Sequence, residues 1–337
     1  MKEPSITVLM SVHNGRAYLR EAIDSVLSQT FPDFEFLIID DASTDDSLAI
    51  IQSYADPRIK VIVNERNMGL TASLNIGLRH VQGEWIARLD ADDRMLPTRL
   101  QVQLQYVHEH PCSVCFSNAI IRDESTGTES VYRQEPWPVA VWTSLFCHGY
   151  GMHPTAFIKK SRILESGGYD GAFLKAQDYD LFDRLCAEGE VFGYVEESLI
   201  IYRRHTQQIS QKGLDEQEQC ARRVSFRAMR RYLPGLTDKE VAALRWLFLG
   251  REQKPTTVAD NLIGLARRLV HTFLRDTRHS GYGRLVYESC LLSSFASRYS
   301  SLGSFRLRAA AWCFACEASI RTLNGLLLLR RMRRVCR

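Results

Sequence analysis

The chain has 337 residues, of which 45% are hydrophobic, so it is long enough for one large domain with an appendage or for two domains, and a largely disordered protein is excluded. The formal charge of +4 is modest but unevenly placed. Arginines crowd the end of the chain, where Glu317 is the only opposing acid, and this end predicts contact with an anionic surface. They are Arg306, Arg308, Arg321, Arg330, Arg331, Arg333, Arg334 and Arg337.

Apolar, β-rich runs alternate with helical patterns through the first hundred residues. We expect strands at 6–12, 34–41, 60–64 and 84–90, and helices at 15–30, 48–54 and 71–80. This alternation predicts βαβ units and therefore an α/β, Rossmann-like fold with a mostly parallel central sheet flanked by helices. A helix from Pro97 to His110 and a further strand at 113–118 are expected next.

The chain changes character in its second half. Residues 122–138 are polar and contain prolines, which predicts a solvent-exposed excursion. A clear helix follows at 177–185, with aspartates in its first turn. From residue 215 nearly everything is helix-forming and rich in arginine, with breaks near 235–240 and 279–284. We therefore predict two domains, 1–214 and a helical, arginine-rich region at 215–337.

The most informative segment is EWIARLDADD at residues 84–93, where an apolar strand runs directly into Asp90, Asp92 and Asp93. Like charges this close cannot all stay ionised cheaply unless a cation or strong donors offset their repulsion. Mg²⁺ or Mn²⁺ would do so with oxygen ligands and would keep positions open for substrate phosphates. For this segment taken alone, an exposed acidic turn is the alternative.

Polar residues also follow the first two expected strands. His13 and Asn14 come after the first strand, and Asp40 and Asp41 end the second. In such sheets ligands bind at the carboxyl ends of the strands, so these residues and Asp90 are expected to share one edge and to form a nucleotide pocket. Carboxylates there accept hydrogen bonds from base or ribose groups.

A third polar element spans residues 67–70 and adds Asn67 to the expected nucleotide-sugar contacts, with Gly69 permitting close approach of the backbone. Asn75 lies in the helix that follows. The alternative is that all these polar residues only cap helices and form turns, with Ser43 or Thr44 capping the helix after the second strand.

Six segments in a fixed order extend these local patterns: VLMSVHNG, IIDDASTDDS, NMGLTASLNIGL, WIARLDADD, GGYDGAFLKAQDYDLFDRL and YRRHTQQIS. Together they resemble the family 2 glycosyltransferases of the GT-A fold, over roughly residues 5–212. The resemblance implies a GT-A domain with a C-terminal helical extension. It also implies an inverting, metal-dependent enzyme that moves a sugar from a nucleoside-diphosphate sugar to a hydroxyl of a glycan or a lipid-linked saccharide.

Carried over position by position, the resemblance implies roles for individual residues. Asp41, with Asp40 beside it, would contact the nucleotide base. Asp90 and Asp92 match the family's D-x-D, which binds the ribose and the Mn²⁺ or Mg²⁺ ion that bridges the diphosphate. His205 lies where the family contacts the diphosphate or the metal.

Asp178 falls where the family has its catalytic base. A single in-line displacement at an anomeric carbon needs a base for the acceptor's proton and a cation for the departing diphosphate. Apolar residues should bury one side of the helix, while Asp180 and Asp183 point elsewhere. A helix cap is the alternative for Asp178. Gln177 replaces the family's common Glu, and the loss of that charge favours ionised Asp178. The segment around His153 resembles a family segment near the acceptor; that His153 is only a turn residue is an alternative of equal weight.

Other classes of protein fit less well. No nucleic-acid partner is expected, because the chain lacks a recognition motif and acids at the sheet edge would repel phosphate without a metal. A phosphatase would carry its D-x-D after the first strand rather than the fourth. A non-catalytic sugar-nucleotide-binding protein remains the alternative, although Asp92 and Asp178 argue against it.

The location of the protein is predicted from its first and last segments. The apolar run 6–12 is short and has no cleavage site after it, and nine scattered cysteines do not form a secreted disulfide framework, so we expect the protein in the cytoplasm. The segment 309–329 is interrupted by Glu317 and Arg321, which disfavours a spanning helix. It predicts a helix on the anionic inner face of the membrane, or else a helix packed on the catalytic domain.

Overall fold

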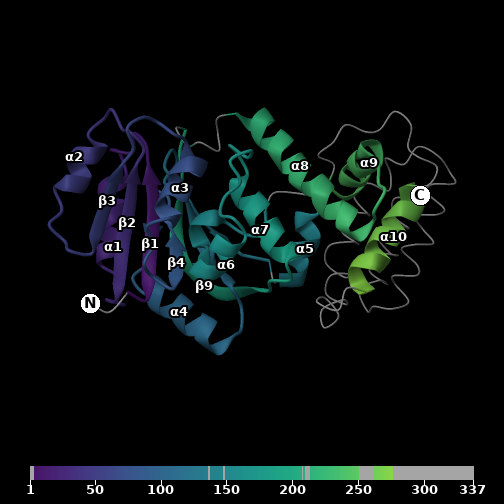
Figure 1. Cartoon of the computed structure of the whole chain (residues 1–337), viewed down its shortest axis with the longest axis horizontal. Coiled ribbons are helices and arrows are strands. Elements are labelled where there is room, and N and C mark those ends of the chain that lie inside the picture. Colours follow the sequence, from purple (N-terminus) through teal and green to yellow (C-terminus); the bar gives the residue numbers. More distant parts are fainter. Residues whose placement is uncertain are drawn as a thin grey trace. The chain divides into compact units, whose positions relative to one another are not determined.

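The computed structural model describes residues 4–135, 137–146, 149–206, 208, 213–249 and 262–275. The chain folds into two compact units, the first comprising Met1–Trp137 with Gly149–Ala221, and the second Pro138–His148 with Arg222–Arg337 (Figure 1). The domain division at residue 214 stays a prediction. The arginine-rich end after residue 305 and the expected break at 279–284 lie outside the described residues.

In the described part of unit 1, nine strands form one mixed sheet with the order β3-β2-β1-β4-β8-β6-β9-β5, and β7 pairs with β6. The strands are β1 (Ile6–Val12), β2 (Phe34–Asp40), β3 (Ile59–Val63), β4 (Trp85–Arg88), β5 (Arg94–Met95), β6 (Val114–Asp123), β7 (Glu129–Tyr132), β8 (Phe157–Lys159) and β9 (Phe192–Arg204). The run from β3 to β4 is parallel, and β8 joins it antiparallel. The predicted α/β fold with flanking helices is confirmed.

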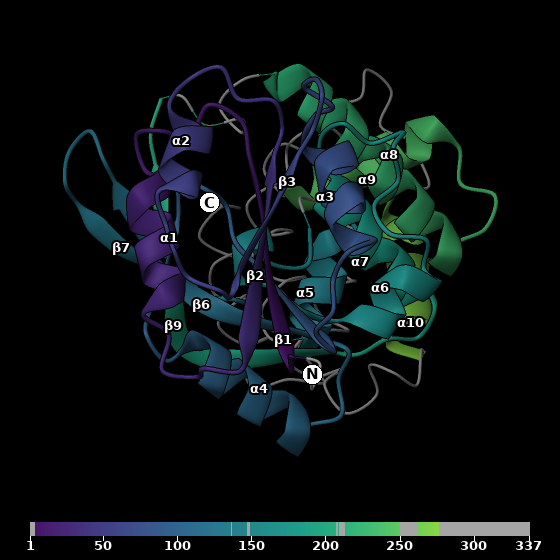
Figure 2. The ribbon, with the colours of Figure 1, turned by 60° about the vertical axis from the view of Figure 1, so that its left-hand side comes forward.

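Helices cover both faces of this sheet. They are α1 (Leu19–Leu27), α2 (Ser47–Gln52), α3 (Leu70–Leu78), α4 (Arg99–Glu109), α6 (Lys160–Glu165) and α7 (Gln177–Ala187), with a 3₁₀ turn, η1 (His153–Thr155). Alternate residues of β1 serve the two faces: Val8 and Met10 share a core cluster with Ile23 of α1, whereas Leu9 lies against Gly77 of α3. Figure 2 shows α1 and α3 on opposite sides of β1 and β2.

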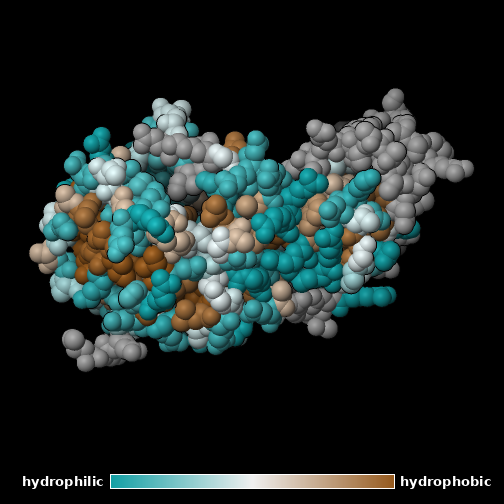
Figure 3. Space-filling view, turned by 45° about the horizontal axis from the view of Figure 1, so that its top comes forward, coloured by the Kyte–Doolittle hydropathy of each residue, from teal (hydrophilic) through white to brown (hydrophobic). Residues whose placement is uncertain are grey.

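The β3 strand ends the parallel run and is the most exposed strand of that run. Val61 and Val63 are 38% and 49% exposed. Figure 3 shows hydrophobic surface at the end of unit 1 where Figure 1 places β3. Among the described strands β3 pairs only with β2, so its other edge is open. The exposed Lys60 on the same strand discourages pairing of that edge with another chain.

Several local expectations need correction. Part of the excursion at 122–138 is a β-hairpin, because β6 extends to Asp123 and pairs with β7, although β7 is exposed as expected. Neither Ser43 nor Thr44 caps α2. Its N-cap is Asp46, and Asp45 Oδ1 accepts hydrogen bonds from the backbone N–H and the hydroxyl of Ser47. The short elements η1, β8 and α6 carry too few residues to show a period in the sequence.

The described elements of unit 2 are helical. They are most of α5 (Trp137–Ser144), the second half of α8 (Leu214–Tyr232), α9 (Asp238–Leu249) and α10 (Leu262–Arg275). Trp142 makes edge-on aromatic contacts with Phe146, Phe248 and Phe273, which form the core of this unit. The predicted helical extension and its break at 235–240 are confirmed. No helix within the described ranges has the length and apolarity to span a bilayer.

Candidate active site

The carboxyl ends of β1, β2 and β4 lie at one edge of the sheet. Val12 pairs with Asp40, and Leu9 pairs with Arg88, so all three strands run in the same direction towards this edge. A Cβ built on Gly15 would lie 3.7 Å from the Cβ of Ala91, which places the loop after β1 beside the D-x-D segment. The structure thus places the polar segments after β1, β2 and β4 at one edge of the sheet, as the sequence predicts.

The loop after β1 is fastened to the loop after β2. His13 Nδ1 donates to the carbonyl of Asp41 at 2.8 Å. The Asn14 amide oxygen accepts from Thr44 N at 2.7 Å and from Asp45 N at 3.3 Å, and Asn14 N donates to Ser43. His13 and Asn14 are both exposed. Their side chains therefore shape the loops of the edge and remain open to a ligand.

Asp41 is buried and organises the third polar element. Its carboxylate accepts from Asn64 Nδ2 at 2.7 Å and from the backbone N–H groups of Met68 and Gly69, both at 2.8 Å. Burial by itself would raise the pKa of Asp41, but these hydrogen bonds outweigh burial and lower it. Asn67 is exposed and closes the same turn by accepting from Gly69 N. Asp41 thus holds the 64–69 loop in place.

Asp40 differs from its neighbour. It is 1% exposed, and one oxygen, Oδ2, accepts from Ser43 N at 3.2 Å. The other oxygen, Oδ1, is buried without a hydrogen-bond partner in the described part of the chain. A buried carboxylate oxygen without a donor is costly, and an N–H or O–H of a ligand would satisfy it. Of the two aspartates, Asp40 is the one whose carboxylate keeps an oxygen without a donor among the described residues.

The D-x-D segment forms a compact acidic cluster. Ligand atoms of Asp90, Asp92 and Asp93 all lie within 4.8 Å of one another. Burial, and then the neighbouring acids, raise the pKa of Asp92 and raise that of Asp93 well above its usual range. Asp93 is fully buried, and its Oδ2 has no partner among the described residues. The folded chain therefore keeps carboxylates together at a free-energy cost that a cation would offset.

This donor set fits Mg²⁺ or Mn²⁺, which take carboxylate oxygens. His205 Nε2 lies 3.0 Å from Asp92 Oδ2. Neighbouring ligand atoms of an octahedral ion bound at about 2.1 Å are themselves about 3 Å apart, so both atoms can reach one ion. The Tyr18 ring lies 4.8 Å from the His205 ring, centre to centre, and fixes its position.

Two arginines, missed in the sequence, hold the acidic cluster. Arg203 donates its backbone N–H to Asp93 and a guanidinium N–H to the carbonyl of Asp92, at 2.9 and 3.0 Å. The Arg203 guanidinium also pairs with Glu21 and Glu124. Arg88 is 1% exposed and pairs with Asp90. The only signal for either was its place in a motif, Arg203 in YRRH and Arg88 two residues before Asp90.

Asp178 is the second residue of α7 and is half-buried. Burial is the main reason why its pKa is raised. Hydrogen bonds from the backbone N–H groups of Tyr179 and of Asp178 itself act in the opposite direction, and the charges of Asp90 and Arg88 have smaller, opposing effects. The N-cap residue of α7 is Ala176, but the carboxylate of Asp178 accepts backbone N–H groups of the first turn, so both the role of base and that of a helix cap stay predictions for Asp178.

The helix α7 is buried on more than its apolar side, because polar residues of the helix are buried as well. Asp180 pairs with Arg184, and Asp183 accepts from Tyr150 Oη at 3.0 Å; both aspartates are fully buried. Both are occupied by structural contacts, and the prediction of a catalytic base on α7 therefore stays with Asp178.

His153 is the first residue of η1 and is buried. Its Nε2 is 2.8 Å from Tyr169 Oη, and burial, with a smaller effect of Arg88, holds its pKa well below the usual range. His153 is 7% exposed, so a contact with an acceptor stays a prediction. Asn75 clamps the backbone of Tyr169 through two hydrogen bonds of 2.7 and 2.9 Å, which gives it a structural role.

Three residues other than glycine adopt a positive φ in the described chain, and all three flank this site: Asn14 at 55°, Ala42 at 55° and Ala176 at 54°. The left-handed conformation costs a residue with a Cβ roughly 1–2 kcal/mol. Such strain persists only where surrounding contacts enforce it, and it clusters at functional sites. The backbone thus turns sharply after β1, after β2 and before Asp178.

The Cys112/Cys115 pair shows no sign of metal binding. Cys115 is buried, and burial raises the pKa of Cys112 to about 11, so both remain protonated thiols. Cys115 is buried and Cys112 is partly buried. Another C-x-x-C pair, Cys313 and Cys316, lies outside the described residues.

Comparisons with known proteins agree with this geometry. A family model described as glycosyl transferase family 2 matches residues 7–168. An uncharacterized glycosyltransferase of Methanocaldococcus jannaschii is 34% identical over 209 residues, which cover 60% of this chain and 72% of that protein. The glycosyltransferase EpsE of Bacillus subtilis is 34% identical over 195 residues, covering 55% of this chain and 68% of that one.

Two solved structures share the fold. TarS of S. aureus, residues 1–349, in complex with UDP-GlcNAc, superposes with a TM-score of 0.59 at 16% identity, covering 84% of this chain and 88% of that one. The mannosyltransferase PcManGT of Pyrobaculum calidifontis, in complex with GDP-Man and Mn²⁺, gives 0.52 at 13% identity, covering 100% and 86%.

Proposed function

The chain belongs to the family 2 glycosyltransferases, and from that premise we propose that it transfers a sugar from a nucleoside-diphosphate sugar to a hydroxyl group, with inversion and with a divalent metal ion. The observation that carries this proposal is the acidic cluster of Asp90, Asp92 and Asp93, which follows β4 at the edge where β2 ends in Asp40. Asp178, at the start of α7, is the residue that the family resemblance assigns as the base.

The donor's base would lie over the loops that follow β1 and β2. Asp40 Oδ1 is the acceptor for a base or ribose donor group, and Asp41 keeps the 64–69 loop in the shape that the pocket needs. His13 and Asn14 line the same loops and are exposed. Asp90, held by Arg88, would face the ribose.

Mn²⁺ or Mg²⁺, when bound, would neutralise the charge of the diphosphate leaving group. Asp92 and His205 would hold the ion, and the buried carboxyl group of Asp93, next to Asp92 in the chain, keeps one oxygen without a partner among the described residues. Arg203 binds the backbone carbonyl of Asp92 and the carboxylate of Asp93 and would so set the direction of these side chains.

Asp178 would act as the general base. In its ionised form it removes the proton from the acceptor hydroxyl as the oxygen attacks the anomeric carbon, and the bond from that carbon to the diphosphate oxygen breaks on the opposite side. One displacement inverts the anomeric configuration. Its position near the start of a helix with a buried apolar core holds the carboxylate rigidly.

The acceptor we propose is a glycan or a lipid-linked saccharide, with the protein in the cytoplasm and its arginine-rich end at the inner face of the membrane. His153 is kept as a positioning residue near the acceptor through its contact with Tyr169. The positive charge of the arginine-rich end supports contact with an anionic membrane surface.

The test is incubation of the purified protein with a panel of nucleotide sugars and glycan acceptors, with Mn²⁺ or with EDTA. Release of nucleoside diphosphate that needs both acceptor and metal, with product of inverted configuration by NMR, is expected. Retained configuration, or turnover unaffected by EDTA, would contradict the mechanism. Donor binding without any turnover would favour the non-catalytic sugar-nucleotide-binding protein.

A further inference from the structure

The helix α3 carries three polar side chains that take no part in the proposed chemistry. Thr71 and Ser73 are buried, and Asn75 is half-buried. Each of them forms a side-chain hydrogen bond with a residue outside the helix. A polar side chain that is buried on a helix needs such a partner, so these three residues show which loops α3 holds.

Ser73 joins α3 to the loops that we assign to the donor. Asn64 Nδ2 donates to Ser73 Oγ at 2.9 Å and to the Asp41 carboxylate at 2.7 Å. The Asp41 carboxylate also accepts from the backbone N–H groups of Met68 and Gly69, directly before α3. The start of α3 is therefore fixed to the loop that follows β2.

Thr71 and Asn75 join α3 to residues 166–176, the segment between α6 and α7. Thr71 Oγ1 donates to the carbonyl of Phe173 at 2.9 Å. Asn75 Nδ2 donates to the carbonyl of Tyr169 at 2.7 Å, and Asn75 Oδ1 accepts from the backbone N–H of Tyr169 at 2.9 Å. Because Thr71 and Asn75 are four positions apart, they share one face of α3, and the segment lies along that face.

The backbone of this segment is adapted to the contact. Gly167 and Gly168 have φ angles of +84° and +73°, and a Cβ on Gly168 would lie 2.8 Å from Asn75 Oδ1. A glycine therefore allows Asn75 to approach the backbone closely. Arg184 of α7 donates to the carbonyl of Gly168 at 2.6 Å. The segment is thus tied both to α3 and to the helix that carries Asp178, and Figure 2 shows α3 and α7 on the same side of β1 and β2.

Resting on the proposed function, in which Asp178 is the base, we propose that Thr71 and Asn75 are positioning residues for Asp178. They hold the segment 166–176 on α3 and so set the place of the base relative to the donor loops. Ala176, in the left-handed conformation at a φ of 54°, leads directly into α7, so a shift of the segment moves the first turn of that helix. A misplacement of about 1 Å can lower the rate about 10²-fold.

The test is a double-mutant cycle on kcat for sugar transfer. Thr71→Val removes the hydrogen bond to Phe173 and keeps the size of the side chain, whereas Thr71→Ser keeps the hydroxyl group and removes a methyl group. Each is measured alone and together with Asp178→Asn. Asn75→Leu, which removes both hydrogen bonds to Tyr169, is measured in the same way.

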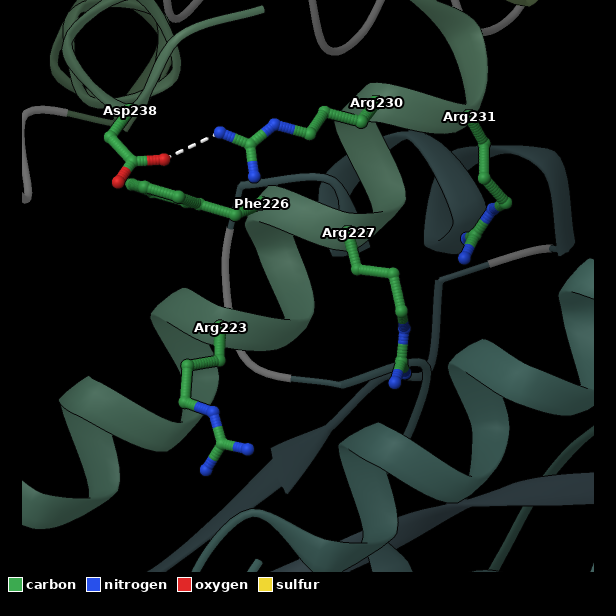
Figure 4. Close-up of a pocket in the computed structure, with 6 residues that line it drawn as sticks. All are labelled: Arg223, Phe226, Arg227, Arg230, Arg231 and Asp238. Atoms are coloured by element: carbon green, nitrogen blue, oxygen red, sulfur yellow. Dashed lines mark hydrogen bonds and ion pairs between the residues drawn. The ribbon is translucent and has the colours of Figure 1, made fainter. Parts of the chain in front are cut away.

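The matched control is Arg230→Met in unit 2. Arg230 lines a pocket of about 600 Å³ on α8 and pairs there with Asp238 (Figure 4). Its Nε also donates to the carbonyl of Leu236 at 2.9 Å, the same length as the hydrogen bond of Thr71. The methionine keeps the aliphatic part of the side chain and removes these interactions. Thermal unfolding of every variant then separates a loss of stability from a loss of rate.

We expect Thr71→Val and Asn75→Leu to lower kcat about tenfold to 10²-fold, because the base is misplaced. The KM for the donor should stay unchanged, and Thr71→Ser should keep most of the wild-type kcat. In the Asp178→Asn background Thr71→Val should cause no further loss, since the residue that it positions no longer acts as a base. Arg230→Met should keep the wild-type kcat.

A general structural effect would give other results. An equal loss of kcat in both backgrounds, a similar loss in Thr71→Ser or Arg230→Met, or a raised KM for the donor would overturn the proposal. It is also overturned if Thr71→Val keeps the wild-type kcat in an enzyme that needs Asp178. If Asp178→Asn itself keeps the wild-type kcat, the base assigned under the proposed function is wrong, and the positioning role falls with it.

Discussion

Asp41→Asn should destabilise unit 1, because Asp41 supports the 64–69 loop. An asparagine side chain has one acceptor oxygen where the carboxylate has two. If that oxygen keeps the hydrogen bonds from Asn64 and Met68, the new NH₂ group faces the N–H of Gly69. One hydrogen bond is lost, two donors oppose each other, and the two remaining hydrogen bonds lose their charge.

The structure allows an estimate of the cost. A hydrogen bond to a charged group contributes about 1.5–3 kcal/mol and a neutral one about 0.5–1.5, so one loss and two weakened bonds add up to roughly 3.5–6 kcal/mol. For a unit of this size each kcal/mol lowers Tm by about 2–4 °C, so the transition of unit 1 should fall by roughly 7–24 °C.

The dependence on pH has a definite sign. The hydrogen bonds lower the pKa of Asp41 below the unfolded value of about 3.9, so its stabilising effect is complete above that value and is lost as the pH falls through the folded pKa. The difference in stability between wild type and Asp41→Asn should therefore be constant near neutral pH and should shrink only in acid.

Asp40→Asn is the matched control. It keeps an oxygen for Ser43 N and removes no hydrogen bond at Oδ1, so its Tm should stay close to that of the wild type while donor binding weakens. Urea and thermal unfolding measure stability, and calorimetry with the nucleoside diphosphate measures binding. If Asp41→Asn unfolds like the wild type, or if Asp40→Asn is the less stable variant, the division of roles is wrong.

Three further outcomes are expected. Asp178→Asn should lower kcat roughly 10²-fold to 10⁴-fold with donor binding intact. Because burial raises the pKa of Asp178, the acid limb of kcat in the wild type should lie above the usual carboxyl value of about 3.9; a midpoint at or below it would contradict that role. Asp92→Ala should abolish metal-dependent binding of nucleoside diphosphate, measured by calorimetry with and without Mn²⁺, and should still fold; near-normal turnover would refute the assignment. A chain ending at Asn324 should lose binding to anionic vesicles, at about 1 kcal/mol for each arginine removed, whereas binding that ignores lipid charge would exclude the tether.

The sequence predicted the parallel half of the sheet because its strands are long apolar runs with turn residues between them. The run 34–40 is fully buried, and 6–12 is buried at nearly every position, so both read clearly as strands. The strand β8 has three residues and β5 has two, too few for a pattern. Their places are set by pairing with residues distant in the chain.

The candidate site was predictable where motif and strand end coincide, as for Asp90 and Asp92. The distinct environments of Asp40 and Asp41 were not, because they depend on a loop that folds back from residues 64–69. Hydrogen-bond partners separated by more than twenty residues leave no periodic signal. Arg203 shows the same limit more clearly, because the residue that it contacts, Glu21, lies 182 positions away in the sequence.

The distribution of cations at the sheet edge indicates what a metal ion would add. Arg88 pairs with Asp90, so the first carboxylate of the cluster already has a counter-charge within the fold. Asp93 accepts only a backbone N–H on one oxygen, and its other oxygen has no partner in the described chain. Neither Asp92 nor Asp93 forms an ion pair with an arginine among the described residues, and His205 lies beside Asp92. Because a cation stabilises carboxylates that the protein leaves without a counter-charge, we expect the metal ion to bind beside Asp92 and His205 and Asp90 to remain available to the ribose.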